Sequence, residues 1–175
     1  MKKDLVWTKT ILSVYRYLER ICGAIDKIVL QSGLNSINLS GFSYYYNNIF
    51  AVSQRLIDLS ERKITLINLK VLIEDVLNHI CEEDAQLLIE RYVDGKKFRE
   101  ISQKCDINMR TLFRRLDKAE NSFARGLKFK GYNEEKLEKF FENVSWIKNV
   151  YSNIAQKNNE DFSLSNGYIE KVASL

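Results

Sequence analysis

Positively charged side chains recur along residues 109–119 in a pattern that suits nucleic-acid binding. Arginine carries a planar fork of donors that matches the acceptor pair of a guanine edge or the oxygens of a phosphate. Leu112 and Leu116 are four residues apart, so a helix here has one apolar side, and the basic residues fall on its remaining surface. We expect this surface to contact base edges in a DNA major groove through Met109, Arg110, Thr111, Phe113, Arg114, Arg115 and Lys118.

The residues before this helix complete a helix-turn-helix pattern. Apolar residues three and four positions apart predict a short helix, and residues 106–108 predict the turn that follows it. Asn108 is typical of a helix N-cap and would accept a hydrogen bond from a backbone N–H near Thr111. The buried face of the short helix comprises Phe98, Ile101 and Cys105. Near its start, the residues placed to contact the phosphate backbone are Lys96, Lys97 and Arg99.

At these residues the chain resembles region 4 of bacterial sigma factors and the ArpU-type phage regulators that share it. The resemblance covers about residues 82–127, since segment 84–95 is also similar to the helix that leads into the family's motif. Ser102, Cys105 and Asp106 depart from the pattern, which has Ala, Leu and Gly at these positions. The matching residues are Phe98, Glu100, Ile101, Ile107, Asn108, Arg110, Thr111, Leu112, Arg114, Arg115, Leu116, Lys118 and Ala119.

The resemblance implies a sequence-specific, double-stranded-DNA-binding transcriptional regulator from a bacterium or phage, with RNA polymerase as a second candidate partner. One alternative is a complete small sigma factor that recruits core polymerase. The roughly eighty residues before the motif show no pattern typical of sigma region 2, and the motif lies mid-chain, so the regulator is favoured. An alternative of another class is a helical protein–protein interaction module that uses the basic helix for docking.

Charge is distributed unevenly along the 175 residues, whose formal net charge is +4. Residues 96–130 hold eleven Lys or Arg against four Asp or Glu, so the rest of the chain is slightly acidic. This asymmetry favours a nucleic-acid-binding face on an otherwise neutral body. Charges also interrupt every apolar run, so we expect no membrane association and a cytoplasmic protein.

No residue pattern typical of catalysis is present. The sequence has one histidine, no glycine-rich phosphate loop and no nucleophile elbow, so we expect no enzymatic activity, no cofactor and no metal site. Cys22, Cys81 and Cys105 lack paired spacing and fall on apolar stripes, which predicts reduced, buried core residues.

The N-terminal region is predicted to be helical. Apolar residues recur every three or four positions from about residue 4 to 31, which predicts one helix that packs inside a bundle. These apolar residues form a seam along one side of the helix, and a homodimer in which two copies pair along this seam is the alternative. Residues 32–41 predict a loop, followed by helices over about 44–63 and 66–80. The seam comprises Trp7, Ile11, Val14, Leu18, Ile21, Ile25 and Ile28.

Three consecutive tyrosines, Tyr44, Tyr45 and Tyr46, lie at the start of the helix expected over about 44–63. We expect them to cover the end of a bundle, and stacking on the bases of an opened DNA strand is the alternative. Acidic residues at 82–84 predict the start of the helix that ends near Gly95.

The sequence continues well beyond the basic helix. Gly126 and Gly131 are both candidates for its end, and Asn133 predicts a cap for a further apolar helix that breaks near 145–146. That helix packs on the same chain or forms a partner surface, and the residues after 156 are polar. Together these patterns predict an all-α helical bundle with an N-terminal helical region (1–64), a helix-turn-helix DNA-binding domain (65–131) and a C-terminal helical extension (132–175).

Overall fold

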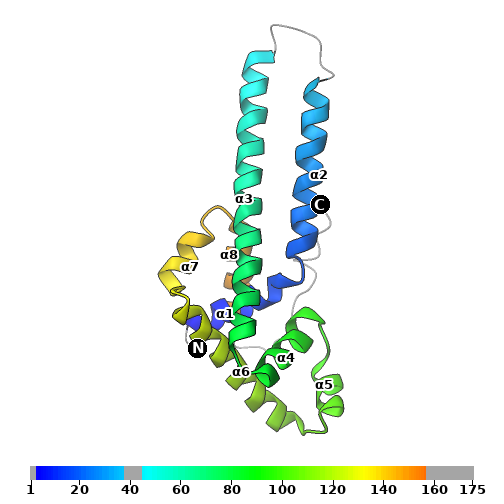
Figure 1. Ribbon diagram of the computed structural model, residues 1–175, viewed down its shortest axis with the longest axis vertical. Helices are drawn as coiled ribbons and strands as arrows, with labels where there is room; N and C mark the ends of the chain where they lie inside the picture. Colours follow the sequence, from blue (N-terminus) through cyan, green and yellow to red (C-terminus); the bar gives the residue numbers. More distant parts are fainter. Residues whose placement is uncertain (1–2, 38–44, 157–175) are drawn as a thin grey trace.

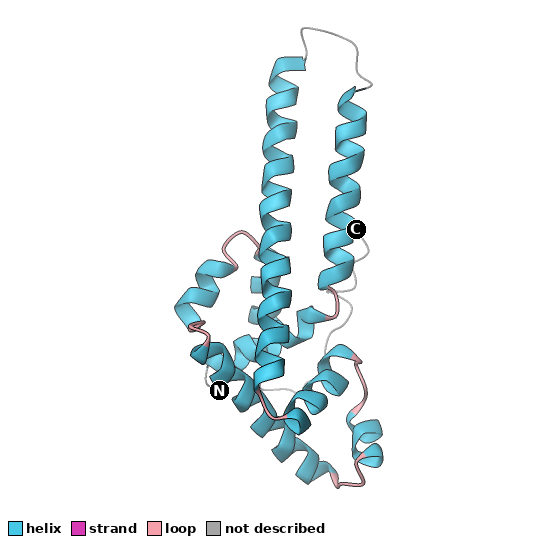
Figure 2. Ribbon diagram, in the orientation of Figure 1, coloured by secondary structure: helices cyan, strands magenta, loops and turns pink. Residues whose placement is uncertain are grey.

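The computed structural model describes residues 3–37 and 45–156, and within these ranges the chain forms eight α-helices, one π-helical turn and no strand (Figure 2). The sequence contains no proline, so nothing in it forces a long helix to break. The predicted all-α bundle is confirmed. Among the described helices, none is both long and apolar enough to cross a membrane. The side chains of residues 44–46 and the polar residues after 156 lie outside the described part.

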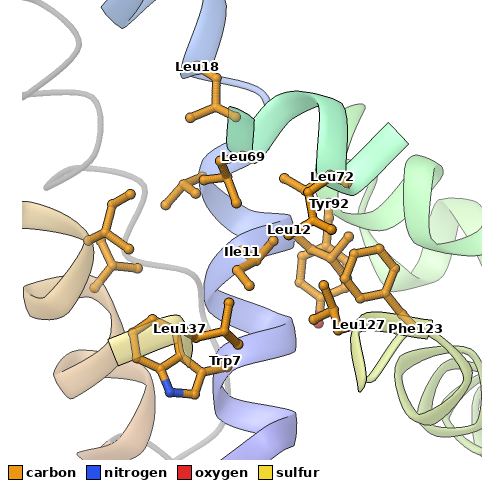
Figure 3. Close-up of a cluster of buried hydrophobic side chains, with 14 of the residues drawn as sticks. Trp7, Ile11, Leu12, Leu18, Leu69, Leu72, Tyr92, Phe123, Leu127 and Leu137 are labelled. Atoms are coloured by element: carbon orange, nitrogen blue, oxygen red, sulfur yellow. The ribbon is translucent and has the colours of Figure 1, made fainter. Parts of the chain in front are cut away.

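Helix α1 (Lys3–Tyr15) lies at the centre of the hydrophobic core (Figure 1). Its Trp7, Ile11 and Leu12 are buried and project into a cluster that includes residues of α3, α6 and α7 (Figure 3). The predicted apolar seam is therefore covered by the rest of the same chain. The seam is buried from Trp7 to Ile25 and half-buried at Ile28, so two copies could pair along its buried part only if these contacts opened.

The prediction of one helix over residues 4–31 is wrong. The chain bends at Arg16 and Tyr17, where the Tyr17 N–H donates to the Val14 carbonyl oxygen over 3.0 Å, and α2 (Leu18–Ile37) starts in a new direction. Leu18 is buried directly after the bend, so the apolar spacing continues across it. Periodicity alone therefore could not reveal the change of direction.

Helix α2 packs antiparallel against α3 (Tyr45–His79), and the two form an arm that projects from the core (Figure 1). Two ion pairs link them: Lys63 Nζ lies 2.5 Å from Asp26 Oδ1, and Lys70 contacts Glu19. Apolar residues between the helices fill the seam that these pairs flank. The arm is therefore held by the same combination of apolar contact and flanking charge as a coiled coil.

Two predictions for this region are wrong. The loop was expected over residues 32–41, but this start is too early, because α2 continues to Ile37. The two helices expected over 44–63 and 66–80 are one helix of 35 residues, since neither proline nor glycine separates them. Helix α3 thus runs without a break across the boundary predicted between residues 64 and 65.

The C-terminal extension folds back on the same chain, as the default interpretation of its apolar face predicted. It consists of α7 (Glu134–Phe140) and α8 (Ser145–Gln156), so a break near 145–146 is confirmed. The Trp7 ring of α1 stacks on Phe141 at 5.4 Å between centroids and contacts Tyr151 at 4.3 Å. The first and last described helices therefore share one core.

The expectation of three buried cysteines is wrong. Cys81 and Cys105 are exposed, and Cys22 is half-buried. Cys81 directly precedes a helix and Cys105 directly follows one. The apolar spacing that places a residue on a buried face applies within a helix and fails at its ends.

Candidate nucleic-acid interface

The helix-turn-helix stands on a support formed by α4 (Glu82–Leu88) and the π-helical turn η1 (Ile89–Val93). In η1 the Asp94 N–H donates to the Ile89 carbonyl oxygen, five residues back, so the turn is wider than that of an α-helix. This geometry buries three consecutive residues, Glu90, Arg91 and Tyr92. Their side chains make the contacts that position the following helices. A helix over about 82–95 was predicted, but its widened turn was not.

The two motif helices lie where the sequence predicted them. They are α5 (Phe98–Lys104) and α6 (Met109–Phe129), and the predicted cap is confirmed, since the Thr111 N–H donates to Asn108 Oδ1 over 2.8 Å. Asp106 has φ +48°, the left-handed conformation that its side chain tolerates better than most. The Ser102 hydroxyl donates to the Ile107 carbonyl oxygen over 2.5 Å. Ser102 and Asp106, both departures from the family pattern, therefore each serve the turn.

Helix α6 is divided along its length into a buried side and an exposed side. The Gly131 residue at its end has φ +78°, and the Tyr132 N–H donates to the Leu127 carbonyl oxygen across it, so Gly131 terminates the helix. Gly126 instead lies inside α6, where a Cβ would stand 2.7 Å from Val76 of α3. The buried side comprises Leu112, Leu116, Ala119, Glu120, Phe123, Ala124 and Leu127.

Buried polar side chains link α6 to η1 and to α1. The Tyr92 hydroxyl donates to Glu120 Oε1 over 2.6 Å, and Lys9 Nζ lies 3.4 Å from Glu120 Oε2. Burial raises the pKa of Glu120 and raises the pKa of Tyr92. Sequence reasoning missed this cluster, because Glu120 has no local signal that separates it from a solvated charge.

Three arginines predicted to contact bases lie on the exposed side. Arg110, Arg114 and Arg115 are all exposed, and within the described ranges their side chains make no hydrogen bond or ion pair. The C-terminal helices α7 and α8 pack on α1, away from the end of α6 that carries these arginines (Figure 1). In the described structure nothing therefore withholds the three guanidinium groups from a ligand.

The other residues predicted to contact bases are either less exposed or already in contact with neighbouring side chains. Thr111 is half-buried at the cap, and Lys118 Nζ lies 3.9 Å from Asp84 Oδ1 while its side chain remains exposed. Met109 is 36% exposed and Phe113 is 43% exposed. The Phe113 ring meets the Phe98 ring edge-on, with 4.9 Å between centroids. Phe113 thus contributes to packing as well as to the outer surface.

Arg91 of η1 contacts the Phe98 ring of this aromatic pair. Its guanidinium lies over the Phe98 ring at 4.0 Å from the centroid and donates from Nη1 to the Lys96 carbonyl oxygen over 3.1 Å. A cation over a ring face is attracted by the ring quadrupole. Arg91 therefore joins η1 to α5 and, through Phe98, to Phe113 of α6. Sequence reasoning did not single out Arg91, because its partners are brought together by the fold.

Of the three cations predicted to contact phosphate, one is already engaged. Lys96 Nζ lies 3.1 Å from Glu90 Oε1 and 3.5 Å from Asp94 Oδ2, and Lys104 bonds to the same Glu90 oxygen. Hydrogen bonding, from Lys104 above all, holds the pKa of Glu90 below its ordinary value. The side chains of Lys97 and Arg99 are exposed and unpaired within the described part of the chain.

The pairing of the basic segment concentrates its free charge at one end. Lys128 Nζ contacts Asp4 at 2.7 Å and Lys130 Nζ contacts Asp75 at 2.6 Å, so the C-terminal end of α6 is neutralised by other helices. Within the described structure, the cations of residues 96–130 that have neither an ion pair nor a side-chain hydrogen bond all lie near the turn of the helix-turn-helix. They are Lys97, Arg99, Arg110, Arg114 and Arg115. Arg125, farther along α6, has no carboxylate partner but donates to the Ser122 hydroxyl.

Nothing in the described ranges resembles a metal site: no group of three or more His, Cys, Asp or Glu residues is placed to hold an ion. Comparison of the chain with family models, with curated proteins and with solved structures gives no match.

Proposed function

We propose that this protein is a sigma-like transcriptional regulator that binds double-stranded DNA in a sequence-specific manner. The observation that carries the proposal is the set of five unpaired cations on the helix-turn-helix, three of them on the exposed side of α6. Single unpaired arginines also occur on the arm, so it is the grouping of five unpaired cations on one motif, beside lysines that pair with carboxylates of other elements, that supports an external anionic ligand.

The dimensions of the exposed part of α6 suit the major groove. An α-helix with its side chains is about 10–12 Å across, and the major groove is about 12 Å wide and admits one helix. From Met109 to Lys118 the helix rises about 14 Å along its axis. Arg110 and Arg114 are four residues apart, so they project from adjacent turns along this length. We assign the base contacts to this face, with Arg110, Arg114 and Arg115 as principal readers and Met109, Thr111, Phe113 and Lys118 beside them.

Phosphate contacts belong to the start of α5. Lys97 directly precedes the helix and Arg99 lies in its first turn, and both are exposed. Lys96 is a weaker candidate, because its ammonium group would have to leave Glu90 before it could bind a phosphate. Cations at these positions would fix the orientation of α6 on the duplex.

Selection of bound sequences from a random duplex library tests the proposal. We expect enrichment of a defined site, and the affinity for that site should fall steeply with salt, because each neutralised phosphate releases counterions. Recovery of random sequence, or binding that salt does not weaken, would contradict it. A bacterial or phage regulator of this kind acts in the cytoplasm.

RNA polymerase is the second partner in this proposal, and its role separates a regulator from a complete sigma factor. The N-terminal helix α1 and part of α3 pack on α6, and α1 also packs on α8, so these helices before the motif support it. This favours a regulator. Promoter-specific initiation by core polymerase and this chain alone would instead identify a sigma factor.

A further inference from the structure

Two large apolar side chains are exposed near the turn of the helix-turn-helix. Within the described residues 98–119 they are Met109 and Phe113, whereas Leu112 and Leu116 of the same helix are buried. Met109 and Phe113 are four residues apart, so they are neighbours on the surface of α6. They form a small apolar patch in the first two turns of the helix. An apolar patch on a surface that binds a ligand indicates an apolar contact with that ligand.

The apolar pair lies beside two of the unpaired arginines. Arg110 and Arg114 are also four residues apart, so they form a row next to the row of Met109 and Phe113. At 3.6 residues per turn, Arg110 and Phe113 are about 60° apart around the helix axis. A ligand that reaches the two arginines would therefore also meet the exposed part of the Phe113 ring.

Contacts within the protein hold this ring in place. The Phe113 ring meets the Phe98 ring edge-on, with 4.9 Å between centroids. Phe98 is itself half-buried, and the guanidinium of Arg91 lies over its ring. Arg91 is buried and donates to the Lys96 carbonyl oxygen, so this series of contacts ends at the backbone. A side chain that is already ordered loses little conformational entropy when it binds a ligand.

We propose that Phe113 recognises the C5-methyl group of thymine. This inference rests on the proposed function, because it requires α6 to lie in the major groove. There the base edges present hydrogen-bond donors and acceptors, and the thymine methyl is their apolar group. A phenyl ring has no donor or acceptor to offer, so it gains from a methyl group and loses against a polar edge. The bound sequence therefore holds a thymine close to the base pairs that Arg110 and Arg114 contact.

Insertion of the ring between base pairs is the other use of an exposed aromatic residue. Apolar wedges of this kind mostly enter from the minor groove and kink the duplex. Phe113 instead lies beside the arginines of a major-groove helix, and its ring is held against Phe98. Bending of the selected duplex that disappears with Phe113→Ala, measured by energy transfer between its ends, would indicate insertion and overturn the methyl assignment.

Replacement of single thymines by uracil tests the proposal, since uracil lacks the methyl group and keeps the hydrogen-bonding groups. In the site selected from the random library, we expect one such exchange to weaken wild-type binding about fourfold, the value of one buried methyl group. The same exchange should leave the affinity of Phe113→Ala unchanged. Arg115→Ala is the matched control, because Arg115 lies on the far edge of the exposed side. It should bind more weakly overall and keep the fourfold effect.

The outcomes separate this inference from the proposed function. A defined site in which no exchange to uracil weakens binding would overturn the methyl assignment and leave sequence-specific DNA binding intact. An effect of uracil that Phe113→Ala retains would do the same. Recovery of random sequence from the library would remove both proposals. We also expect Phe113→Ala to retain the base preference that Arg115→Ala loses, which shows that its α6 still folds and docks.

A second variant leaves the Phe113 side chain unchanged and alters what holds it. Arg91 acts through Phe98, so it is a positioning residue, and Arg91→Met removes the guanidinium while it fills much of the same space. We expect the effect of uracil to fall from about fourfold to about twofold, because the ring would then have to be ordered on binding. The base preference that depends on Arg115 should persist. An unchanged fourfold effect would show that Arg91 does not hold the ring and would overturn this part of the proposal.

Discussion

At the scale of single residues, the protein uses its cations in two ways. Arg110, Arg114 and Arg115 stay unpaired at the surface within the described structure, whereas Lys96 and Lys104 are held by the buried Glu90. Residues of the same charge, close together in sequence, thus differ in whether they are paired. The difference arises from whether a carboxylate of another element lies within reach.

Arg114→Ala should weaken binding to the selected DNA site by about 1–3 kcal/mol and relax specificity at one base pair, because a bidentate contact to a base edge is lost. Arg125→Ala is the matched control, since Arg125 is exposed on the same helix but donates to Ser122 and lies beyond the free cations. The measurement is a gel shift at fixed salt with specific and random duplexes. Equal losses for both variants would remove Arg114 from the base-reading face.

Glu90→Gln should destabilise the protein near neutral pH by about 1–3 kcal/mol, because Lys104 and Lys96 lose their charged acceptor. The pKa of Glu90 is lowered in the folded state, so its contribution is fully present above the ordinary value of 4.5 and is lost as pH falls through the lowered pKa. Denaturant unfolding of both proteins over this range should show the difference shrinking on acidification. A constant difference would show that Glu90 acts through packing alone.

At the scale of elements, caps and crossings define where each helix begins and how closely it packs. Asn108 caps α6 and Asn133 caps α7, each through a backbone N–H three residues later. Gly126 lets α6 approach α3 at Val76, while a Cβ added at Gly23 of α2 would meet no neighbouring heavy atom within 4 Å. Local sequence therefore determines the caps, whereas the contacts between helices determine whether a position has room for a side chain larger than that of glycine.

Asn108→Ala should lower the free energy of unfolding by about 1 kcal/mol, since the N–H of Thr111 loses its acceptor. It should also weaken DNA binding, because the cap fixes the first turn of α6. Asn133→Ala removes an equivalent cap far from the free cations and should reduce stability alone. Thermal unfolding and DNA titration of both variants separate the two effects. Identical DNA affinity in both variants would show that the cap does not order the reading face.

Gly126→Ala and Gly23→Ala should change stability in opposite directions. A Cβ at residue 126 meets Val76 at 2.7 Å, and the β-branched Val76 cannot turn aside easily, so we expect a loss of about 1–3 kcal/mol. At residue 23 the added methyl group meets open space within a helix, so we expect a gain of about 0.5–1 kcal/mol. Urea unfolding of both variants gives the signs. A stabilising Gly126→Ala would contradict the close crossing of α6 and α3.

At the scale of the whole molecule, one core joins the ends of the described chain to the helix-turn-helix. Trp7 of α1 contacts Phe141 and Tyr151 of the C-terminal extension, and α1 also packs on α6. The three predicted regions therefore contribute to one core, and we expect them to unfold together. The arm formed by α2 and α3 alone extends beyond this core (Figure 1).

Trp7→Ala should therefore destabilise the whole core by about 3–5 kcal/mol, the usual cost of emptying a large buried site. Trp146→Ala is the control, because Trp146 is half-buried at the edge of the same core and should cost less. Hydrogen exchange of the variants should show protection lost together in α1, α6 and α8 for Trp7→Ala. Protection that persists in α6 would show that the helix-turn-helix folds independently.

Local patterns in the sequence determined the all-α class, the turn between α5 and α6, and the Asn108 and Asn133 caps. These features depend on interactions between residues at most a few positions apart, so short stretches of sequence specify them. Only the tertiary structure decided the bend at Arg16 and Tyr17, the burial of Glu90 and Glu120, and the exposure of Cys81 and Cys105. It also decided which cations are free: Lys128 is neutralised by Asp4, 124 residues away, and no local pattern can indicate a partner at that separation.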